Sequence, residues 1–385
     1  MEKNNMEIQR VTKNPRSKKK KFDYLDPKGD PITNGETLER INKLVIPPGY
    51  KDVKIANTSR NYLQAIGIDD KGRKQYIYRP SFVEKRTKDK YCQLKHFGQI
   101  VEQIRRDIRK TLLSDKSIQN KEKMICLMLY ILDTCHFRIG NIHYYNNHKT
   151  HGVSTLHISH LKFKPREVDI EFIGKKSVLN KCSLKDPLSI RLLKELAKIA
   201  KKAKSDFVFN YFDQGTKKYR LIRPDEVNSY LSKYHSDITL KMYRTWAANQ
   251  VFLEEMIKRK KDFKALDTAL KKKSQYKNLA KEVKRIEKEK NKLIKEIIIE
   301  IANKLHNTPT VSKKSYLDNN LIQIYMSDPT YFWRKISRAT KKDLTGILVS
   351  FLSKNCQVDK KKKITHKKNQ KQKGGWMSYI HHYLF

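Results

Sequence analysis

The sequence predicts an α+β protein with a small, mainly β N-terminal domain and a larger, mainly α domain that contains a small sheet. Up to about residue 82, short apolar runs alternate with turn-forming dipeptides, a pattern typical of short strands. From Ile100 onward, apolar residues recur every three to four positions, as on one face of a helix. Between residues 153 and 182 the period shortens to that of strands, which predicts a sheet inside the helical domain.

The net charge points to a polyanionic partner. The 385 residues include 85 Lys and Arg against 40 Asp and Glu, a formal charge of +45. Such an excess repels itself unless a polyanion neutralises it; nucleic acid is the first candidate and an anionic membrane surface the weaker alternative. The longest apolar run, Met124 to Leu132, is too short to span a bilayer, and the first 15 residues contain no apolar signal region. We therefore expect an intracellular protein that is not embedded in a membrane.

The cysteines show no paired spacing. The five positions are scattered along the chain: Cys92, Cys126, Cys135, Cys182 and Cys356. This pattern predicts reduced thiols, and neither a disulfide framework nor a zinc site.

The N-terminal part divides into a tail, a domain and a connector. Residues 1–21 are polar and end in RSKKKK, which predicts a basic, disordered tail. In residues 22–83 the turns DPKGDP, PPGY and DDKGRK separate the apolar runs KLVI, YLQAIGI and QYIYR, which predicts the β domain. The charged stretch VEKRTKDKY (83–91) is interpreted as a connector.

The larger domain is predicted to occupy residues 84–350. Ile100, Ile104 and Ile108 mark a first helix, and the next, KEKMICLMLYILDTCHF, is apolar nearly all round and should form the buried centre. VSTLHISHLKF and EVDIEFIGKKSVLNKCSL are predicted strands joined by short turns. Two further helices are predicted in RLLKELAKIAKKAKS and in RPDEVNSYLSKY, which has Pro near its start.

A Lys/Glu-rich stretch at 254–299 interrupts this domain. Several of its apolar residues follow a heptad-like spacing that Lys290 breaks: Leu279, Val283, Ile286, Leu293 and Ile297. A coiled-coil hairpin or helical arm and a single charged amphipathic helix both fit this pattern. We expect removal of residues 256–296 to leave the chemistry of the chain intact. Residues 351–385 are predicted to be a basic tail that ends in the apolar GWMSYIHHYLF.

Four short segments along the chain contain cationic residues, and the last of them ends in Tyr316. These islands are HFRIGN (136–141), EFIGKKS (171–177), KMYRTW (241–246) and LHNTPTVSKKSY (305–316). A phenol with a pKa of about 10 is a poor nucleophile at neutral pH, but nearby cations favour the phenolate. Attack on a phosphodiester builds negative charge that Arg side chains match, and a Lys can protonate the leaving oxygen. The residues that supply these roles are Arg138, Lys175, Arg244, Asn307 and Tyr316.

Each of these signals alone has an ordinary structural explanation. Arg138 can cap the preceding helix, and Gly174-Lys175 can be a surface turn; it is no P-loop, because the spaced glycines are missing. Lys241 and Arg244 can be simple phosphate clamps, and Tyr316 can be a core aromatic. The combination is far more specific than its parts.

These islands resemble the motifs of type IB DNA topoisomerases of the small poxvirus, giant-virus and bacterial kind. HFRIGN followed by HGVSTLHISHLKF is similar to the first-Arg motif, FIGKKS to the hairpin with the catalytic Lys, KMYRTW to the Lys-x-x-Arg motif, and LHNTPTVSKKSY to the nucleophile motif. IPPGYKDV, LQAIGIDDKGRKQYIYRP and VEKRTKDKY resemble the DNA-clamping cap domain. The resemblance covers residues 22–325 apart from the Lys/Glu-rich stretch, and it implies the tyrosine recombinase/topoisomerase IB catalytic fold.

The resemblance implies roles for individual residues. Tyr316 attacks the scissile phosphate and forms a 3′-phosphotyrosyl link. Lys175 is the general acid for the 5′-hydroxyl, with Lys176 as the alternative if the hairpin register differs. Arg138 and Arg244 hold the non-bridging oxygens.

Further roles follow from the same resemblance. Asn307 takes a position that is His in the poxvirus enzymes and stabilises the transition state, whereas the adjacent His306 is out of register. Lys241 assists positioning or proton transfer. Four residues are implied to contact DNA: Gln75, Tyr76, Tyr78 and Tyr144.

The implied activity is transient nicking of duplex DNA, swivelling and religation, which relaxes positive and negative supercoils. It needs no ATP, metal or other cofactor, and the resemblance implies a monomer that clamps double-stranded DNA. The Lys/Asn-rich composition is typical of AT-rich genomes such as those of some large DNA viruses, so a virion, host cytoplasm or nucleus would be the location.

Two other readings stay open at this point. A tyrosine recombinase uses the same chemistry, but usually has His-x-x-Arg where this chain has Lys241 and Arg244, and it would not relax a plasmid without its site. A non-catalytic basic DNA-binding protein would explain the charge but not the ordered islands, and its behaviour would not depend on Tyr316.

Overall fold

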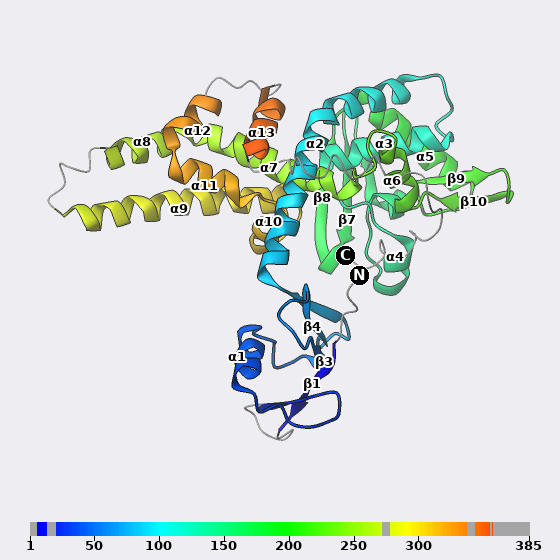
Figure 1. Cartoon of the computed structure of the whole chain (residues 1–385). Coiled ribbons are helices and arrows are strands. Elements are labelled where there is room, and N and C mark those ends of the chain that lie inside the picture. The colour runs from blue at the N-terminus through cyan, green and yellow to red at the C-terminus, as the bar shows by residue number, and fades with distance from the viewer. Residues whose placement is uncertain (1–5, 14–20, 272–277, 337–342, 355, 357–385) are drawn as a thin grey trace, which may run out of the picture. The chain divides into compact units, whose positions relative to one another are not determined.

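The computed structural model describes residues 6–13, 21–271, 278–336, 343–354 and 356 (Figure 1). The chain forms two compact units, Met1–Lys90 and Tyr91–Phe385. The first is built on a sheet and the second is mainly helical with small antiparallel sheets. The predicted α+β class is therefore confirmed.

The first unit is a five-stranded antiparallel sheet in the order β2-β1-β3-β4-β5. Its strands are listed here in chain order: β1 (Ile8–Thr12), β2 (Phe22–Leu25), β3 (Lys51–Ile55), β4 (Leu63–Ile68) and β5 (Lys74–Tyr78). Helix α1 (Gly35–Lys43) adds Ile41 to a small core with Ile8, Val53 and Ile55. Asn34 caps α1 by accepting a hydrogen bond from the Thr37 backbone N–H.

Three expectations for this part of the chain are wrong. Strand β1 lies inside the predicted tail. Its sequence, IQRVT, lacks the apolar alternation of a strand, and only Ile8 of its residues is buried. KLVI is not a strand, because Leu44 ends α1 and Val45 has a left-handed backbone (φ 48°). The expected connector at 83–91 is part of one continuous helix, α2 (Pro80–Leu113).

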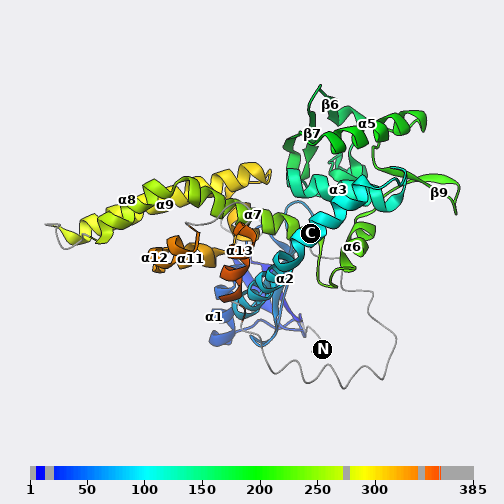
Figure 2. The same cartoon turned by 90° about the horizontal axis from the view of Figure 1, so that it is seen from above.

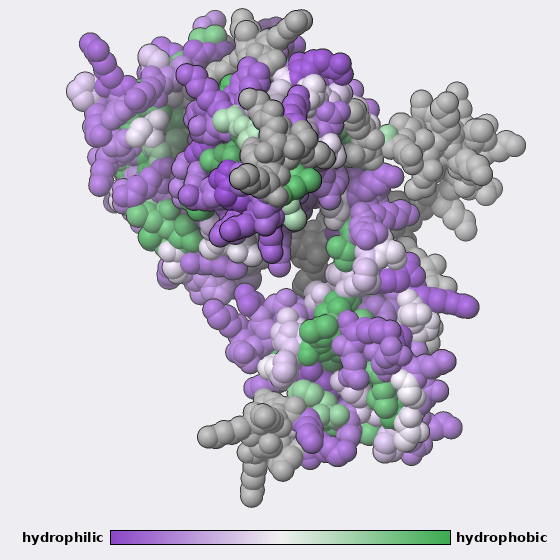
Figure 3. Space-filling view, turned by 90° about the vertical axis from the view of Figure 1, so that its left-hand side faces the viewer, coloured by the Kyte–Doolittle hydropathy of each residue, from purple (hydrophilic) through white to green (hydrophobic). Residues whose placement is uncertain are grey.

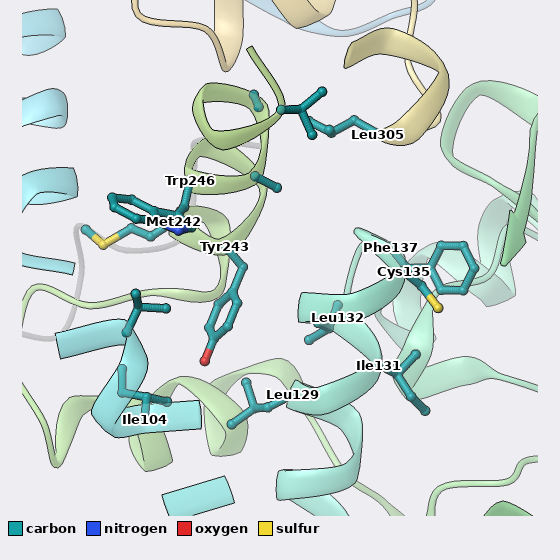
Figure 4. Packing of buried hydrophobic residues seen from close by; sticks show 14 of the residues in the cluster. Ile104, Leu129, Ile131, Leu132, Cys135, Phe137, Met242, Tyr243, Trp246 and Leu305 are labelled. Atoms are coloured by element: carbon teal, nitrogen blue, oxygen red, sulfur yellow. The ribbon is translucent and has the colours of Figure 1, made fainter. Parts of the chain in front are cut away.

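The core of the second unit lies between α2, α3 (Lys121–Cys135) and α7 (Leu240–Lys258). The prediction that the apolar helix forms the buried centre is confirmed, since ten of the fifteen residues of α3 are buried. Figure 4 shows Tyr243 of α7 facing Leu129 of α3 and Ile104 of α2. A side chain at Gly98 of α2 would come within 2.3 Å of the Trp246 ring, so the glycine allows α2 and α7 to approach closely.

A three-stranded antiparallel sheet, β6 (Leu161–Phe163), β7 (Val168–Gly174) and β8 (Val178–Leu184), lies in this unit as predicted. The first predicted strand is mostly wrong: Val153–Thr155 and Ile158–His160 are 3-10 turns. The remaining elements between α3 and α7 are α4 (Ile142–His148), α5 (Pro187–Lys202), β9 (Asn210–Asp213), β10 (Lys218–Leu221) and α6 (Pro224–Ser232).

The Lys/Glu-rich stretch forms a helical hairpin. Helices α8 (Lys260–Lys271) and α9 (Leu279–Lys304) lie side by side in Figures 1 and 2, which confirms the hairpin rather than a single helix. In the described residues that follow, the helices are α10 (Pro309–Ser315), α11 (Asn319–Ser327), α12 (Pro329–Ile336) and α13 (Asp343–Lys354). The expected basic tail therefore begins later than residue 351, and GWMSYIHHYLF lies outside the described residues.

A buried polar network joins this hairpin to the helices after it. Lys290, which breaks the heptad spacing, is buried, and its Nζ lies 2.6 Å from Asp267 Oδ1. Tyr325 Oη donates to the same oxygen at 3.1 Å, and Trp333 Nε1 donates to Asp267 Oδ2 at 2.8 Å. Removal of residues 256–296 would leave both donors without Asp267, so we expect the deletion to lower stability, while its effect on the chemistry of the chain stays a prediction.

The expectation of reduced cysteines is also wrong for four of the five. The structure pairs Cys92 with Cys356 and Cys135 with Cys182, and leaves Cys126 as a buried free thiol. The partners are 264 and 47 positions apart, so only the fold brings them together.

The surface is largely hydrophilic, as the high content of charged residues leads one to expect. The face drawn in Figure 3 is dominated by hydrophilic residues, with smaller apolar patches between them. Among the helices of the described residues, none has the length and apolar character needed to cross a membrane.

The Asp267 network gives a stability prediction. Substitution Asp267→Ala leaves the Lys290 ammonium buried and unpaired, which we expect to lower the free energy of unfolding by about 3–5 kcal/mol. Asp262→Ala, an exposed position on the same helix, is the matched control and should change it by less than about 0.5 kcal/mol. Urea unfolding followed by circular dichroism measures both; equal effects of the two substitutions would contradict the network's role.

Candidate active site

Tyr316 lies directly after a short, well-capped helix. Thr308 caps α10 by accepting a hydrogen bond from the Val311 N–H, and Pro309 occupies the first turn. The helix ends at Ser315, and the Tyr316 N–H still donates to the Ser312 carbonyl at 3.1 Å. Tyr316 as a residue is 9% exposed and packs in the core of the second unit.

The backbone around Tyr316 is held by two buried side chains. Asn249 of α7 donates through Nδ2 to the Tyr316 carbonyl at 2.9 Å, and its Oδ1 accepts from the Asp318 N–H at 2.8 Å. Tyr91 of α2 donates through its hydroxyl to the Leu317 carbonyl at 2.6 Å. The sequence analysis missed both residues. No local signal marked Asn249, because Gln250 follows it and α7 contains several other polar residues.

Arg244 of α7 is buried under the site, with 5% of the residue exposed. Its Nη1 donates to the His136 carbonyl, and its Nη2 donates to the Leu305 carbonyl at 2.6 Å. The guanidinium carbon lies 5.2 Å from the centre of the Tyr316 ring. Arg244 therefore joins three segments: the end of α3, the end of α9 and the tyrosine.

Arg138 and Asn307 lie on the two turns that Arg244 joins. Arg138 Nη2 donates to Asn307 Oδ1 at 2.5 Å. The chain reaches Arg138 through His136, which ends α3 in the left-handed conformation (φ 54°). Gly140 has φ 79° and packs against Gly152 so closely that a Cβ would lie 2.8 Å from the Gly152 Cα. A glycine is thus required in the HFRIGN turn.

Two donors at the centre of the site have no acceptor. Among the described residues, Arg244 Nε and Asn307 Nδ2 are buried nitrogen atoms without a hydrogen-bond partner. An unsatisfied buried donor costs about 1–3 kcal/mol. The oxygens of an anionic group are acceptors that could satisfy such donors.

Lys175 lies in the turn that joins β7 to β8. The residue as a whole is exposed, but its ammonium is partly desolvated, and this burial, followed by the charge of Arg138, lowers the pKa of Lys175; the Tyr316 phenol opposes the shift. The neighbouring Lys176 adopts a left-handed backbone (φ 60°). The electrostatic coupling to Arg138 and Tyr316 favours Lys175 over Lys176 as the group at the site.

The charges around Tyr316 are cationic. Burial opposes ionisation of the phenol, but the charges of Arg244, Arg138 and Lys241 outweigh it, so the pKa of Tyr316 is lowered from its usual 10.0. Lys241 itself is exposed at the start of α7. Burial and the repulsion from Arg138 lower the pKa of Arg244 to about 10 despite Tyr316. The site therefore favours negative charge.

His306 does not take part in this arrangement. Its Nε2 lies 3.3 Å from the Cys135 carbonyl, and its ring packs 5.2 Å from that of Phe137. Burial lowers the pKa of His306 to about 4, so the ring is neutral. His306 therefore contacts Cys135 and Phe137, and the expectation that Asn307 rather than His306 is in register stays a prediction.

The residues expected to contact DNA fall into separate places. On β5, Tyr76 and Tyr78 stack with ring centres 6.4 Å apart and share one face of the edge strand. Gln75 points to the other face by the alternation of the strand, and its amide donates to Asp69 at 2.9 Å. Tyr144 is 44% exposed on α4 in the second unit.

Known proteins resemble the chain in both units. Residues 79–342 match the family described as eukaryotic DNA topoisomerase I, catalytic core, and residues 21–69 match the bacterial DNA topoisomerase IB N-terminal domain. The chain is 28% identical over 315 residues to DNA topoisomerase 1B of Acanthamoeba polyphaga mimivirus, which covers 80% of this chain and 85% of that protein. It is 24% identical over 332 residues to DNA topoisomerase 1B of Vaccinia virus (strain Copenhagen), with 85% and 92% covered.

The cationic surroundings of Tyr316 predict its titration. The absorbance of phenolate at alkaline pH, recorded as the difference between the wild type and Tyr316→Phe, should show a midpoint below pH 10. Arg138→Gln removes one of the charges that stabilise the phenolate, so the same difference measured in the Arg138→Gln background should move to higher pH. A midpoint above 10 in the wild type, or no upward shift, would contradict the electrostatic account.

Proposed function

Because the chain belongs to the DNA topoisomerase I family of type IB enzymes, we propose that Tyr316 is the nucleophile that cleaves one strand of duplex DNA. The observation that carries this assignment is the pair of buried donors, Arg244 Nε and Asn307 Nδ2, beside a tyrosine surrounded by cations. Such a set of donors and cations is suited to a phosphate group next to a phenolate.

The cleavage step exchanges one ester bond for another. The Tyr316 oxygen attacks phosphorus, the bond from phosphorus to the 5′ oxygen breaks, and a 3′-phosphotyrosine forms. Arg138 and Arg244 stabilise the charge on the non-bridging oxygens, and Asn307 donates its free N–H. Lys175 gives its proton to the departing 5′ oxygen, and its lowered pKa makes it a better acid than an ordinary lysine.

Religation reverses these steps with the same groups. The 5′-hydroxyl returns its proton to Lys175 and attacks phosphorus, and Tyr316 leaves as a phenolate that Arg244 and Arg138 stabilise. The ester energy is kept in the phosphotyrosine, so neither ATP nor a metal ion is needed. Between the two steps the free 5′ end rotates and supercoils of either sign relax.

The remaining assignments concern DNA contact. Lys241, at the N-terminal end of α7, assists in positioning the phosphate or in proton transfer. The exposed Tyr76 and the adjacent Tyr78 offer an aromatic surface to double-stranded DNA, and Tyr144 offers a second one from the other unit. Gln75 joins them only if DNA draws it away from Asp69. The protein acts as a monomer on DNA inside a cell or virion.

Plasmid relaxation tests the proposal. Wild-type protein should relax a supercoiled plasmid that carries no specific site, in EDTA and without ATP. Tyr316→Phe should lower the rate by at least about 10³-fold, because the nucleophilic oxygen is lost. Tyr219→Phe, an exposed tyrosine on β10, is the matched control and should retain full activity.

The other outcomes have defined meanings. Relaxation that survives Tyr316→Phe would refute the nucleophile assignment. No relaxation by the wild type, together with recombination of a specific site, would favour a tyrosine recombinase. DNA compaction without strand cleavage would favour a packaging protein.

A further inference from the structure

Three histidines gather outside the candidate active site, in the segment that connects α4 to β6. His151, His157 and His160 each bring a ring nitrogen to within 4.8 Å of the others, and all three are half-buried. We propose that they bind one divalent transition-metal ion, with Zn²⁺ as the best fit, and that the ion braces the segment between Arg138 and Lys175. This proposal does not depend on the proposed function, because the ion does not take part in cleavage.

Two of the rings are prepared to act as ligands. His151 Nδ1 lies 2.8 Å from the Thr155 carbonyl, which can only accept, so Nδ1 carries the proton and Nε2 has a free lone pair. A backbone carbonyl behind the second nitrogen is the usual support of a metal-bound histidine. Among the described residues, His157 Nε2 is a buried polar atom without a hydrogen-bond partner, and a bound ion would satisfy it.

The third ring, that of His160, has to give up one hydrogen bond to bind an ion. His160 Nδ1 accepts from the His157 backbone N–H at 3.0 Å, so in the metal-free protein the proton lies on Nε2. Coordination through either nitrogen gives up this bond. Zn–N bonds of about 2.0–2.1 Å place tetrahedral ligands about 3.4 Å apart, so the ring nitrogens have to close by up to about 1.4 Å.

The chemistry of the donors fits a borderline-soft ion. Imidazole suits Zn²⁺, Cu²⁺ or Ni²⁺ and does not suit Mg²⁺ or Ca²⁺, which prefer oxygen. Because the three residues are half-buried, water can complete the coordination.

Aromatic packing is the ordinary alternative. Tyr145 and Phe207 contact His157 edge-on with ring centres 5.3 and 4.7 Å away, and the rings of His157 and His160 stack at 5.1 Å. These contacts explain why flat side chains lie here. They do not explain a buried ring nitrogen without a partner, which phenylalanine would avoid.

The cluster lies on the scaffold of two active-site residues. The His151 N–H donates to the Ile173 carbonyl at 2.9 Å, two positions before Lys175. The Val153 N–H donates to the Arg138 carbonyl at 3.0 Å. Leu161, next to His160, pairs with Ile170 of β7. An ion that fixes the three rings therefore limits the motion of the turn with Arg138 and of the hairpin with Lys175.

Metal binding to the untagged full-length protein tests the proposal. After treatment with EDTA and its removal, calorimetric titration with ZnCl₂ should show one ion per chain, and Co²⁺ should give the visible absorption of a four-coordinate site. Bound Zn²⁺ should also raise the unfolding temperature. His157→Phe keeps the contacts with Tyr145 and Phe207, and should weaken binding by at least about tenfold. His235→Phe, an exposed histidine elsewhere in the unit, should not change binding.

Two results would overturn the proposal. One is the absence of binding by wild-type protein whose circular dichroism shows that it is folded. The other is binding that His157→Phe leaves unchanged, which would assign the ion to other groups. Neither result bears on plasmid relaxation in EDTA, which tests the proposed function separately.

Discussion

The candidate active site depends on the contacts of the buried Arg244 guanidinium. Its bonds to the His136 and Leu305 carbonyls hold the turns that carry Arg138 and Asn307 against α7, and its charge lies over the Tyr316 ring. Burying a cation beside a second cation is costly, and Arg138 adds to that cost. The arrangement is stabilised when an anion enters, so the free protein is already organised for a phosphate.

A second layer of polar contacts fixes the position of Tyr316, the proposed nucleophile. Asn249 and Tyr91 bind the backbone from Tyr316 to Asp318, and the Asp267 network holds the helices that follow. A tyrosine whose backbone is already held in place loses little conformational entropy when substrate binds, and this pre-orientation raises the reaction rate. The helical hairpin therefore holds, through Tyr325 and Trp333, the helices that follow the proposed nucleophile, as well as adding charge to the surface.

The periodicity of apolar residues and the short motifs predicted those parts of the protein whose structure depends on neighbouring residues. The apolar α3, the β7–β8 hairpin and the islands around Arg138, Lys175, Arg244 and Tyr316 were all visible in the sequence. Strand β1 was missed, because its pairing with β2 and β3 is not encoded in apolar alternation. Asn249 and the pairing of Asp267 with Lys290 were missed for a similar reason: partners far apart in the chain decide whether a buried polar residue is satisfied. The disulfide pairing has the same nonlocal origin.

The identity of the covalent link tests the account most directly. A nicked duplex from which the 5′ fragment can diffuse away should trap the protein on DNA, and proteolysis with mass spectrometry then locates the attached nucleotide. The account predicts a phosphotyrosine at Tyr316, joined to the 3′ end, with a free 5′-hydroxyl on the released strand. An adduct at another residue, or at a 5′ end, would contradict it.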